Sequence, residues 1–170
     1  MSTEIVNRVA KSKLVTIDLE DFYPAGKRVH FDISKWLAEG IVLREKEFRS
    51  SVENHDWSQY QDAYVALYCK TDAIIPGWAY LLITLQLAPY AKKVVVGSLE
   101  DLETVLFTEF LIDFDVSKYE NKPIIITGCS HKPIPETAYT LLAQKLFPVA
   151  RSVMYGEACS SVPLFKRPFR

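Results

Sequence analysis

From residue 63 to residue 155, short apolar runs rich in β-branched residues alternate with longer apolar or amphipathic stretches. The short runs do not alternate apolar with polar residues, which is typical of strands covered on both faces. They span 64–68, 93–96, 123–126 and 152–155, and the longer stretches that predict helices span 75–88, 99–110 and 136–147. Strand–helix alternation with right-handed crossovers predicts an α/β fold, a three-layer sandwich with a mostly parallel sheet.

The first sixty residues are more polar and less regular. Strands are predicted at 14–17 and 29–31, and a helix at 44–54. Asp32 has the character of an N-cap for a further short helix that ends at Gly40. We therefore expect one domain over residues 1–170, in which an irregular α+β appendage (1–60) packs on a βαβ core (61–170). No internal repeat is visible.

Two features of this core are specific enough to test. The runs around Val65, Val95, Ile125 and Val153 are predicted to lie parallel in one sheet, because the connections between them exceed the dozen or so residues that a parallel link needs. The stretch 75–88 is apolar all round and predicts a helix enclosed between the sheet and another layer. Its larger side chains are expected to be mostly buried, namely Trp78, Leu81, Leu82 and Leu85.

Composition narrows the function classes. Twenty basic against twenty-one acidic residues give a net charge of -1, which provides no general attraction to nucleic acid or anionic membranes. The most apolar stretch, 73–88, contains Pro76 and Gly77 and is shorter than the roughly 20 residues of a membrane span. The N-terminus lacks the apolar run of a signal peptide. These features favour a cytoplasmic protein, and there is no glycine-rich nucleotide signature.

The three cysteines each follow a predicted strand. Cys69 follows 64–68, Cys129 follows 123–126, and Cys159 follows 152–155. Because the carboxyl ends of parallel strands meet at one edge of a sheet, the three thiols are predicted to lie near one another. Three thiolates with a fourth ligand, for which His131 and Glu157 are the candidates, form a site suited to zinc, iron or an iron–sulfur cluster.

Two other interpretations stay open. In the first, the chain is a thiol-dependent enzyme, in which one cysteine is the nucleophile and Glu157 or His131 assists it. In the second, it is a non-catalytic interaction module whose cysteines are inert core residues, since free cysteine is among the most buried residue types. The sequence leaves open whether the chain is an enzyme and what its oligomeric state is.

Several segments together resemble a known family. They are Ile5–Ala10, Trp57–Tyr60, Asp72–Pro76, Gly128–Ser130 and Gly156–Ser160. The family is an uncharacterised bacterial one, catalogued as a domain of unknown function and often encoded near iron–sulfur assembly genes. The resemblance implies metal or sulfur chemistry at Cys69, Cys129 and Cys159. It also implies iron–sulfur assembly proteins as candidate partners.

Overall fold

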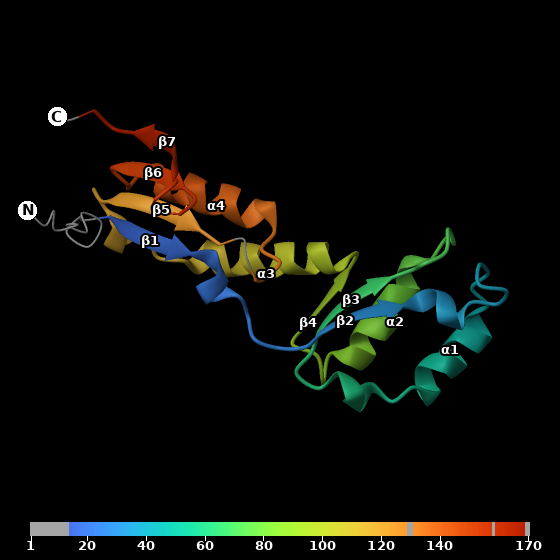
Figure 1. The fold of residues 1–170 in the computed structure, drawn as a ribbon. Coiled ribbons are helices and arrows are strands. Elements are labelled where there is room, and N and C mark those ends of the chain that lie inside the picture. The colour runs from blue at the N-terminus through green and yellow to red at the C-terminus, as the bar shows by residue number, and fades with distance from the viewer. Residues whose placement is uncertain (1–13, 129–130, 158, 169–170) are drawn as a thin grey trace, which may run out of the picture. The chain divides into compact units, whose positions relative to one another are not determined.

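The computed structural model describes residues 14–128, 131–157 and 159–168 (Figure 1). The chain divides into two compact units, each with a sheet and a hydrophobic core of its own. Unit 2 is the continuous segment Pro24–Leu106, and unit 1 contains the described residues up to Tyr23 and from Phe107 onward. These boundaries do not coincide with the expected boundary at residue 60. The α/β class and the predominance of parallel pairing are confirmed.

The predicted single sheet is wrong. The strands around Val65 and Val95 pair with each other in unit 2, whereas those around Ile125 and Val153 pair in a separate sheet in unit 1. Both pairings are parallel, as expected for these two crossovers, whereas the segment between Val96 and Pro123 connects two sheets instead of two strands of one sheet. Strand and helix patterns indicate local structure, but they do not indicate which strands share a sheet.

Unit 2 has a three-stranded parallel sheet in the order β2–β3–β4. The strands are β2 (Arg28–Asp32), β3 (Tyr64–Tyr68) and β4 (Lys93–Val96). Helices α1 (Glu45–Asn54) and α2 (Gly77–Leu87) pack with Val65 and Leu67 in one core. Helix α3 (Leu99–Asp113) places Leu102 and Leu106 against Ala66. Because side chains of a strand alternate between faces, unit 2 has three layers.

Unit 1 has a four-stranded sheet in the order β1–β5–β6–β7. The strands are β1 (Val15–Asp18), β5 (Pro123–Thr127), β6 (Ser152–Tyr155) and β7 (Val162–Lys166). Helix α4 (Glu136–Leu146) and the second half of α3 cover one face, where Phe107 and Leu142 pack against Ile124. Strand β7 was not predicted; it pairs antiparallel with β6 and contains Pro163, which an edge strand tolerates.

The two units repeat one another, contrary to the sequence-based conclusion that no repeat is present. The shift along the sequence that takes Val65 to Ile124 takes β3 onto β5, and it takes Val94 of β4 onto Val153 of β6. The strand register is the same in both units, because Val65 pairs with Val94 and Ile124 pairs with Val153. The same shift takes α1 onto the second half of α3 and α2 onto α4. Identical residues at positions related by this shift include Phe48 and Phe107, Asp56 and Asp115, Tyr60 and Tyr119, Pro76 and Pro135, Tyr80 and Tyr139, Pro89 and Pro148, and Gly97 and Gly156.

The repeat extends to the first strand of each unit and to the turns. His30 pairs with Ala66 in unit 2 as Thr16 pairs with Ile125 in unit 1. Asp32 and Asp18 end these strands, and each carboxylate accepts a hydrogen bond from the backbone N–H two residues later. A short 3₁₀ helix follows each of these strands, at Leu19–Phe22 in unit 1 and Ile33–Trp36 in unit 2. A second pair of 3₁₀ helices precedes β5 and β3, at Ser117–Tyr119 and Trp57–Tyr60. We call positions related in this way equivalent positions.

Helix α2 is less enclosed than predicted. Its buried side chains are Ala79, Ile83 and Leu87, which face the unit 2 core. Leu81 and Leu85, both expected to be buried, are 65% and 71% exposed. An apolar composition on all sides predicted burial on all sides, but α2 contacts its sheet and α1 along one side only.

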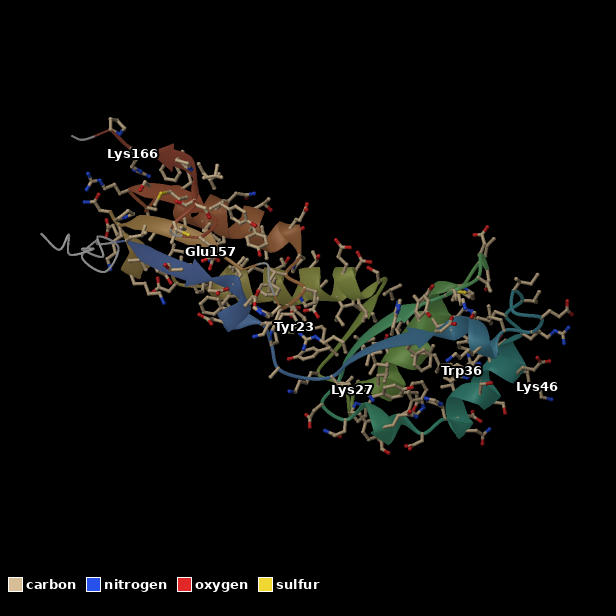
Figure 2. All side chains as sticks on the ribbon, in the orientation of Figure 1. Tyr23, Lys27, Trp36, Lys46, Glu157 and Lys166 are labelled. Atoms are coloured by element: carbon tan, nitrogen blue, oxygen red, sulfur yellow. The ribbon has the colours of Figure 1, made fainter. Side chains whose placement is uncertain are left out.

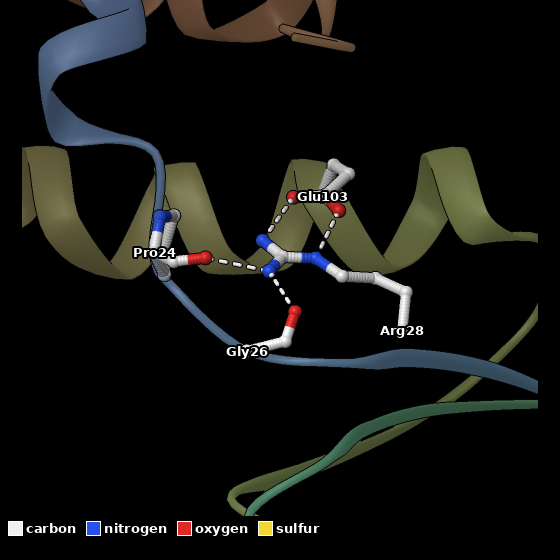
Figure 3. A network of polar contacts seen from close by, with 4 residues as sticks. All are labelled: Pro24, Gly26, Arg28 and Glu103. Atoms are coloured by element: carbon white, nitrogen blue, oxygen red, sulfur yellow. Dashed lines mark hydrogen bonds and ion pairs between the residues drawn. The ribbon is translucent and has the colours of Figure 1, made fainter.

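Glu103 on α3 is buried, although glutamate is almost never fully buried unless it is paired. Its side chain is only 4% exposed and forms an ion pair with Arg28. The guanidinium Nε and Nη2 donate to the two carboxylate oxygens at 2.7 and 3.1 Å (Figure 3). The guanidinium Nη1 also donates to the carbonyl oxygens of Pro24 and Gly26. This network fastens the segment before β2 to α3 within unit 2.

Acidification is expected to destabilise the protein through His55, whose ring lies among Phe31, Trp36, Trp57 and Tyr60. Burial lowers the pKa of His55, and Asp56 opposes this only in part. Stability present above the unfolded pKa, near 6.5, is therefore lost as the pH falls through it toward the folded value. Chemical denaturation at neutral pH and near pH 5 should show a larger loss for the wild type than for His55→Gln. Equal losses would contradict this assignment.

Candidate functional site

The carboxyl edge of the unit 1 sheet gathers most of the candidate ligands. Strands β1, β5 and β6 are parallel, so the segments that follow them leave the sheet at the same edge. The Gly156 N–H donates to the carbonyl oxygen of Ile126 at 3.0 Å, which holds the ends of β5 and β6 together. His131 and Glu157 both follow these strand ends, and Cys129 follows β5 in the sequence.

Glu20 connects the segment after β1 to the segment after β5. Its side chain is 13% exposed, and Oε1 accepts a hydrogen bond from the His131 backbone N–H at 3.0 Å. Its other oxygen, Oε2, lies 3.8 Å from Nδ1 of the exposed His131 ring. Lys132 Nζ donates to the Glu20 carbonyl oxygen at 2.8 Å. Glu20 therefore fixes the backbone of the His131 loop and lies beside its ring.

Sequence reasoning did not identify Glu20 or Lys132. Glu20 lies in the 3₁₀ helix that Asp18 caps, immediately after β1. The available signal was an Asp at a strand end followed by acidic residues, which indicates a capped turn. That signal does not reveal the partner, because His131 is far from Glu20 in the sequence and only the pairing of β1 with β5 brings them together.

Glu157 and Cys159 follow the end of β6. Glu157 follows Gly156 and is exposed (Figure 2). Cys159 is a free, exposed cysteine in the turn where the Ser160 N–H donates to the Glu157 carbonyl oxygen at 2.9 Å. Cys129 lies outside the described residues.

Cys69 does not share this edge. It follows β3, which belongs to the unit 2 sheet, so the expected single rim for all three cysteines does not exist. Its thiol is half-buried, and Sγ lies 3.4 Å from the Thr71 hydroxyl, which itself donates to the Gly40 carbonyl oxygen. Among the side chains that the structure describes, no three His, Cys, Asp or Glu gather where they could hold a metal ion.

The equivalent edge of unit 2 has different chemistry. The Asp32 carboxylate accepts hydrogen bonds from the Ser34 and Lys70 N–H groups at 3.0 and 3.1 Å. Burial raises the pKa of Asp32, but these hydrogen bonds hold it below its usual value. Lys70 and Asp72 occupy the positions equivalent to Cys129 and His131. Unit 2 therefore keeps the scaffold of the unit 1 edge but lacks the cysteine and histidine at these two positions, and its own thiol, Cys69, lies one residue earlier.

The turn after β5 requires glycine, and Gly128→Ala is expected to lower stability by about 1–3 kcal/mol. Gly128 has a φ of 121°, and an added Cβ would lie 3.0 Å from Asp18 Oδ1. Gly77 is a matched control, because nothing lies within 4 Å of an added Cβ there. Gly77→Ala should stabilise α2 by about 0.4–1 kcal/mol. Thermal unfolding of both variants tests this contrast, which equal shifts would refute.

Comparison with known proteins places the chain in a family. A family model described as "Protein of unknown function (DUF2480)" matches residues 3–167, which is almost the whole chain. The chain belongs to this family. The match supports the resemblance to an uncharacterised family, and it carries no activity of its own. No curated protein and no solved structure matches the chain.

No helix in the described part of the chain is both long enough and apolar enough to cross a bilayer. The longest described helix, α3, has Glu100 and Asp101 in its first turn.

Proposed function

We propose that unit 1 binds one soft metal ion, zinc or iron, at the carboxyl edge of β5 and β6. The ligands are the Cys129 and Cys159 thiolates and the His131 imidazole, with the Glu157 carboxylate as the fourth. Two thiolates with an imidazole and a carboxylate form a donor set of the kind that zinc prefers. Cys69, which follows a strand of the other sheet, is not part of this site.

The observation that carries the proposal is the contact between Glu20 and His131. Histidines that bind metals commonly face a carboxylate with the ring nitrogen that does not bind the ion. Glu20 lies beside Nδ1 of His131, which leaves Nε2 as the ligand atom. The hydrogen bond from the His131 N–H to Glu20 sets the loop in place before the metal binds.

The adjacency of β5 and β6 supplies the second support. Two ligands come from the segment after each strand, and the Gly156 N–H holds these strand ends together. The four proposed ligands therefore come from two neighbouring loops of one sheet. The protein then handles a metal, and the family resemblance implies an iron–sulfur assembly protein as its partner.

Metal analysis of the full chain, purified without oxygen, tests the proposal. We expect about one zinc or iron per chain in the wild type, as a single site of this kind holds one ion. Cys129→Ser and Cys159→Ser should lose the metal, whereas the matched control Cys69→Ser should keep it. An absorption spectrum in the visible range would distinguish an iron–sulfur cluster from zinc.

Glu20→Gln tests the supporting carboxylate. Loss of such a partner typically weakens metal affinity by about 10–100-fold while the ligands stay in place. Circular dichroism should show the fold of each variant unchanged, so that a loss of metal reports the site itself. A wild-type chain that neither contains metal nor takes up added Zn²⁺ would overturn the proposal, as would equal metal loss in Cys69→Ser.

A further inference from the structure

Unit 1 has a solvent-facing apolar groove between α3 and α4. Its volume is about 320 Å³, and it is lined by Thr108, Leu111, Ile112, Leu141, Gln144 and Lys145. Ile112 is 68% exposed at this groove. The Lys145 ammonium donates to the carbonyl oxygens of Leu111 and Ile112, so its charge is bound to backbone acceptors. We call this hollow the α3–α4 groove.

The repeat shows that the fold does not require this groove. Ile112 is equivalent to Glu53 of α1, so unit 2 has a charged side chain where unit 1 has an apolar one. Thr108 is equivalent to Arg49, whose guanidinium lies 5.3 Å from the ring centroid of Trp78. An exposed apolar hollow that the shared scaffold does not need favours an interaction specific to unit 1.

The α3 side of the groove is acidic. Glu109 and Asp113 are exposed and four residues apart, so they lie on one side of α3. Each directly follows a residue that lines the groove. Two carboxylates against one ammonium, that of Lys145, leave this side net acidic. We call Glu109 and Asp113 the acidic rim; together with the groove, they suit a ligand that combines apolar and basic side chains.

The sequence before β1 has this complementary chemistry. In an α-helix, Ile5, Val6 and Val9 would share one side. The family match begins at residue 3, so it includes these residues. Basic residues of the segment outnumber acidic ones; they are Arg8, Lys11 and Lys13, against Glu4. So short a helix is marginal in water by itself and needs a surface to pack on.

This segment joins unit 1 at the same end as the groove. Strand β1 begins at Val15, beside the start of β5, and α3 and α4 each end on the side of the sheet where β5 and β6 begin (Figure 1). The thickness of the helix layer is about one helix diameter, 10–12 Å. The backbone from Val9 to Leu14 spans up to about 17 Å when extended, which is enough to pass around that layer.

We propose that residues 5–12 form a helix that docks in the α3–α4 groove of their own chain. The three apolar side chains of this helix cover Ile112, and its basic side chains lie near the acidic rim. A separate partner needs an interface of about 1,000 Å² or more to bind stably. A tethered segment binds at a high effective concentration, so a groove of this size is sufficient for it.

Hydrogen exchange of the full chain, measured by mass spectrometry over residues 5–12, tests this docking. These amides should exchange about tenfold or more faster in Ile112→Lys and in Val6→Lys than in the wild type, because either change places an unpaired charge in an apolar contact. Asn7→Lys is the control within the segment, since it adds the same charge on the opposite side of the helix. Leu85→Lys, at a residue of α2 that is 71% exposed, is the control outside the groove. Both controls should keep the wild-type protection.

Charge reversal at the acidic rim tests the electrostatic part of the contact. Asp113→Lys should also speed exchange of residues 5–12, and more so at low salt, because exposed charges interact most strongly there. Circular dichroism should show an unchanged fold in every variant. Wild-type amides that exchange as fast as those of the free peptide would overturn the proposal. So would protection that Ile112→Lys leaves intact, because the segment would then pack elsewhere, or protection that rises with protein concentration, because a second copy would then supply the segment.

Discussion

Arg28→Met is expected to lower the free energy of unfolding by about 3–5 kcal/mol, the usual cost of removing one partner of a buried ion pair. Arg28 and Glu103 are 13% and 4% exposed, so the carboxylate left behind would remain desolvated. The variant also loses the hydrogen bonds from Nη1 to the carbonyl oxygens of Pro24 and Gly26. Urea denaturation monitored by tryptophan fluorescence would measure the effect, because Trp36, Trp57 and Trp78 all lie in unit 2.

A second substitution separates the buried charge from the packing. Adding Glu103→Leu to Arg28→Met should recover part of the lost stability, because an apolar pair can replace a buried ion pair at little cost. The exposed pair Arg44–Glu47 is the control, with side chains 57% and 59% exposed. Arg44→Met should change stability by less than about 1 kcal/mol. A similar loss in Arg44→Met and Arg28→Met would show that burial of the pair is not the cause.

Ile83→Ala should destabilise the protein by about 2–5 kcal/mol, as other large-to-small substitutions in a core do. Ile83 is fully buried among the side chains that join α2 to the unit 2 sheet. Its equivalent in unit 1, Leu142, is fully buried on α4, so Leu142→Ala should produce a loss in the same range.

Leu81 is the matched control on the same helix. It is two residues from Ile83 but mostly exposed, so Leu81→Ala should change stability by no more than about 0.5 kcal/mol. Equal losses for Leu81→Ala and Ile83→Ala would restore the sequence-based expectation that α2 is enclosed on all sides.

The repeat was present in the sequence but was found only through strand pairing. The shared residues, such as Phe48 with Phe107 and Pro76 with Pro135, are scattered among positions that differ. Each pair has a structural role, since the first supplies a buried ring to each core and the second precedes a helix in each unit. The two units share residues mainly where core packing or a turn requires them. The matching strand registers of the two sheets therefore reveal the repeat more readily than the sequence does.

The candidate site was predicted in part. His131 and Glu157 were singled out because they follow strands, and the parallel pairing of β5 with β6 places both segments at one edge. Grouping Cys69 with them assumed a single sheet, and that assumption failed. Glu20 was missed because its contact with His131 spans more than a hundred residues of sequence, and no local pattern encodes such a contact.

Local elements could be predicted from residue order alone: strands where β-branched runs occur, helices where longer apolar stretches follow, and an N-cap at Asp32. These depend on interactions between residues close in the chain, which spacing and residue type reveal. Only the folded chain shows that the strands form two sheets, that Glu103 is buried and that Leu81 is exposed. These outcomes depend on which distant segments pack together. A helix such as α3 can bury one stretch in each of two cores, and the periodicity of its sequence does not distinguish that arrangement from a single core.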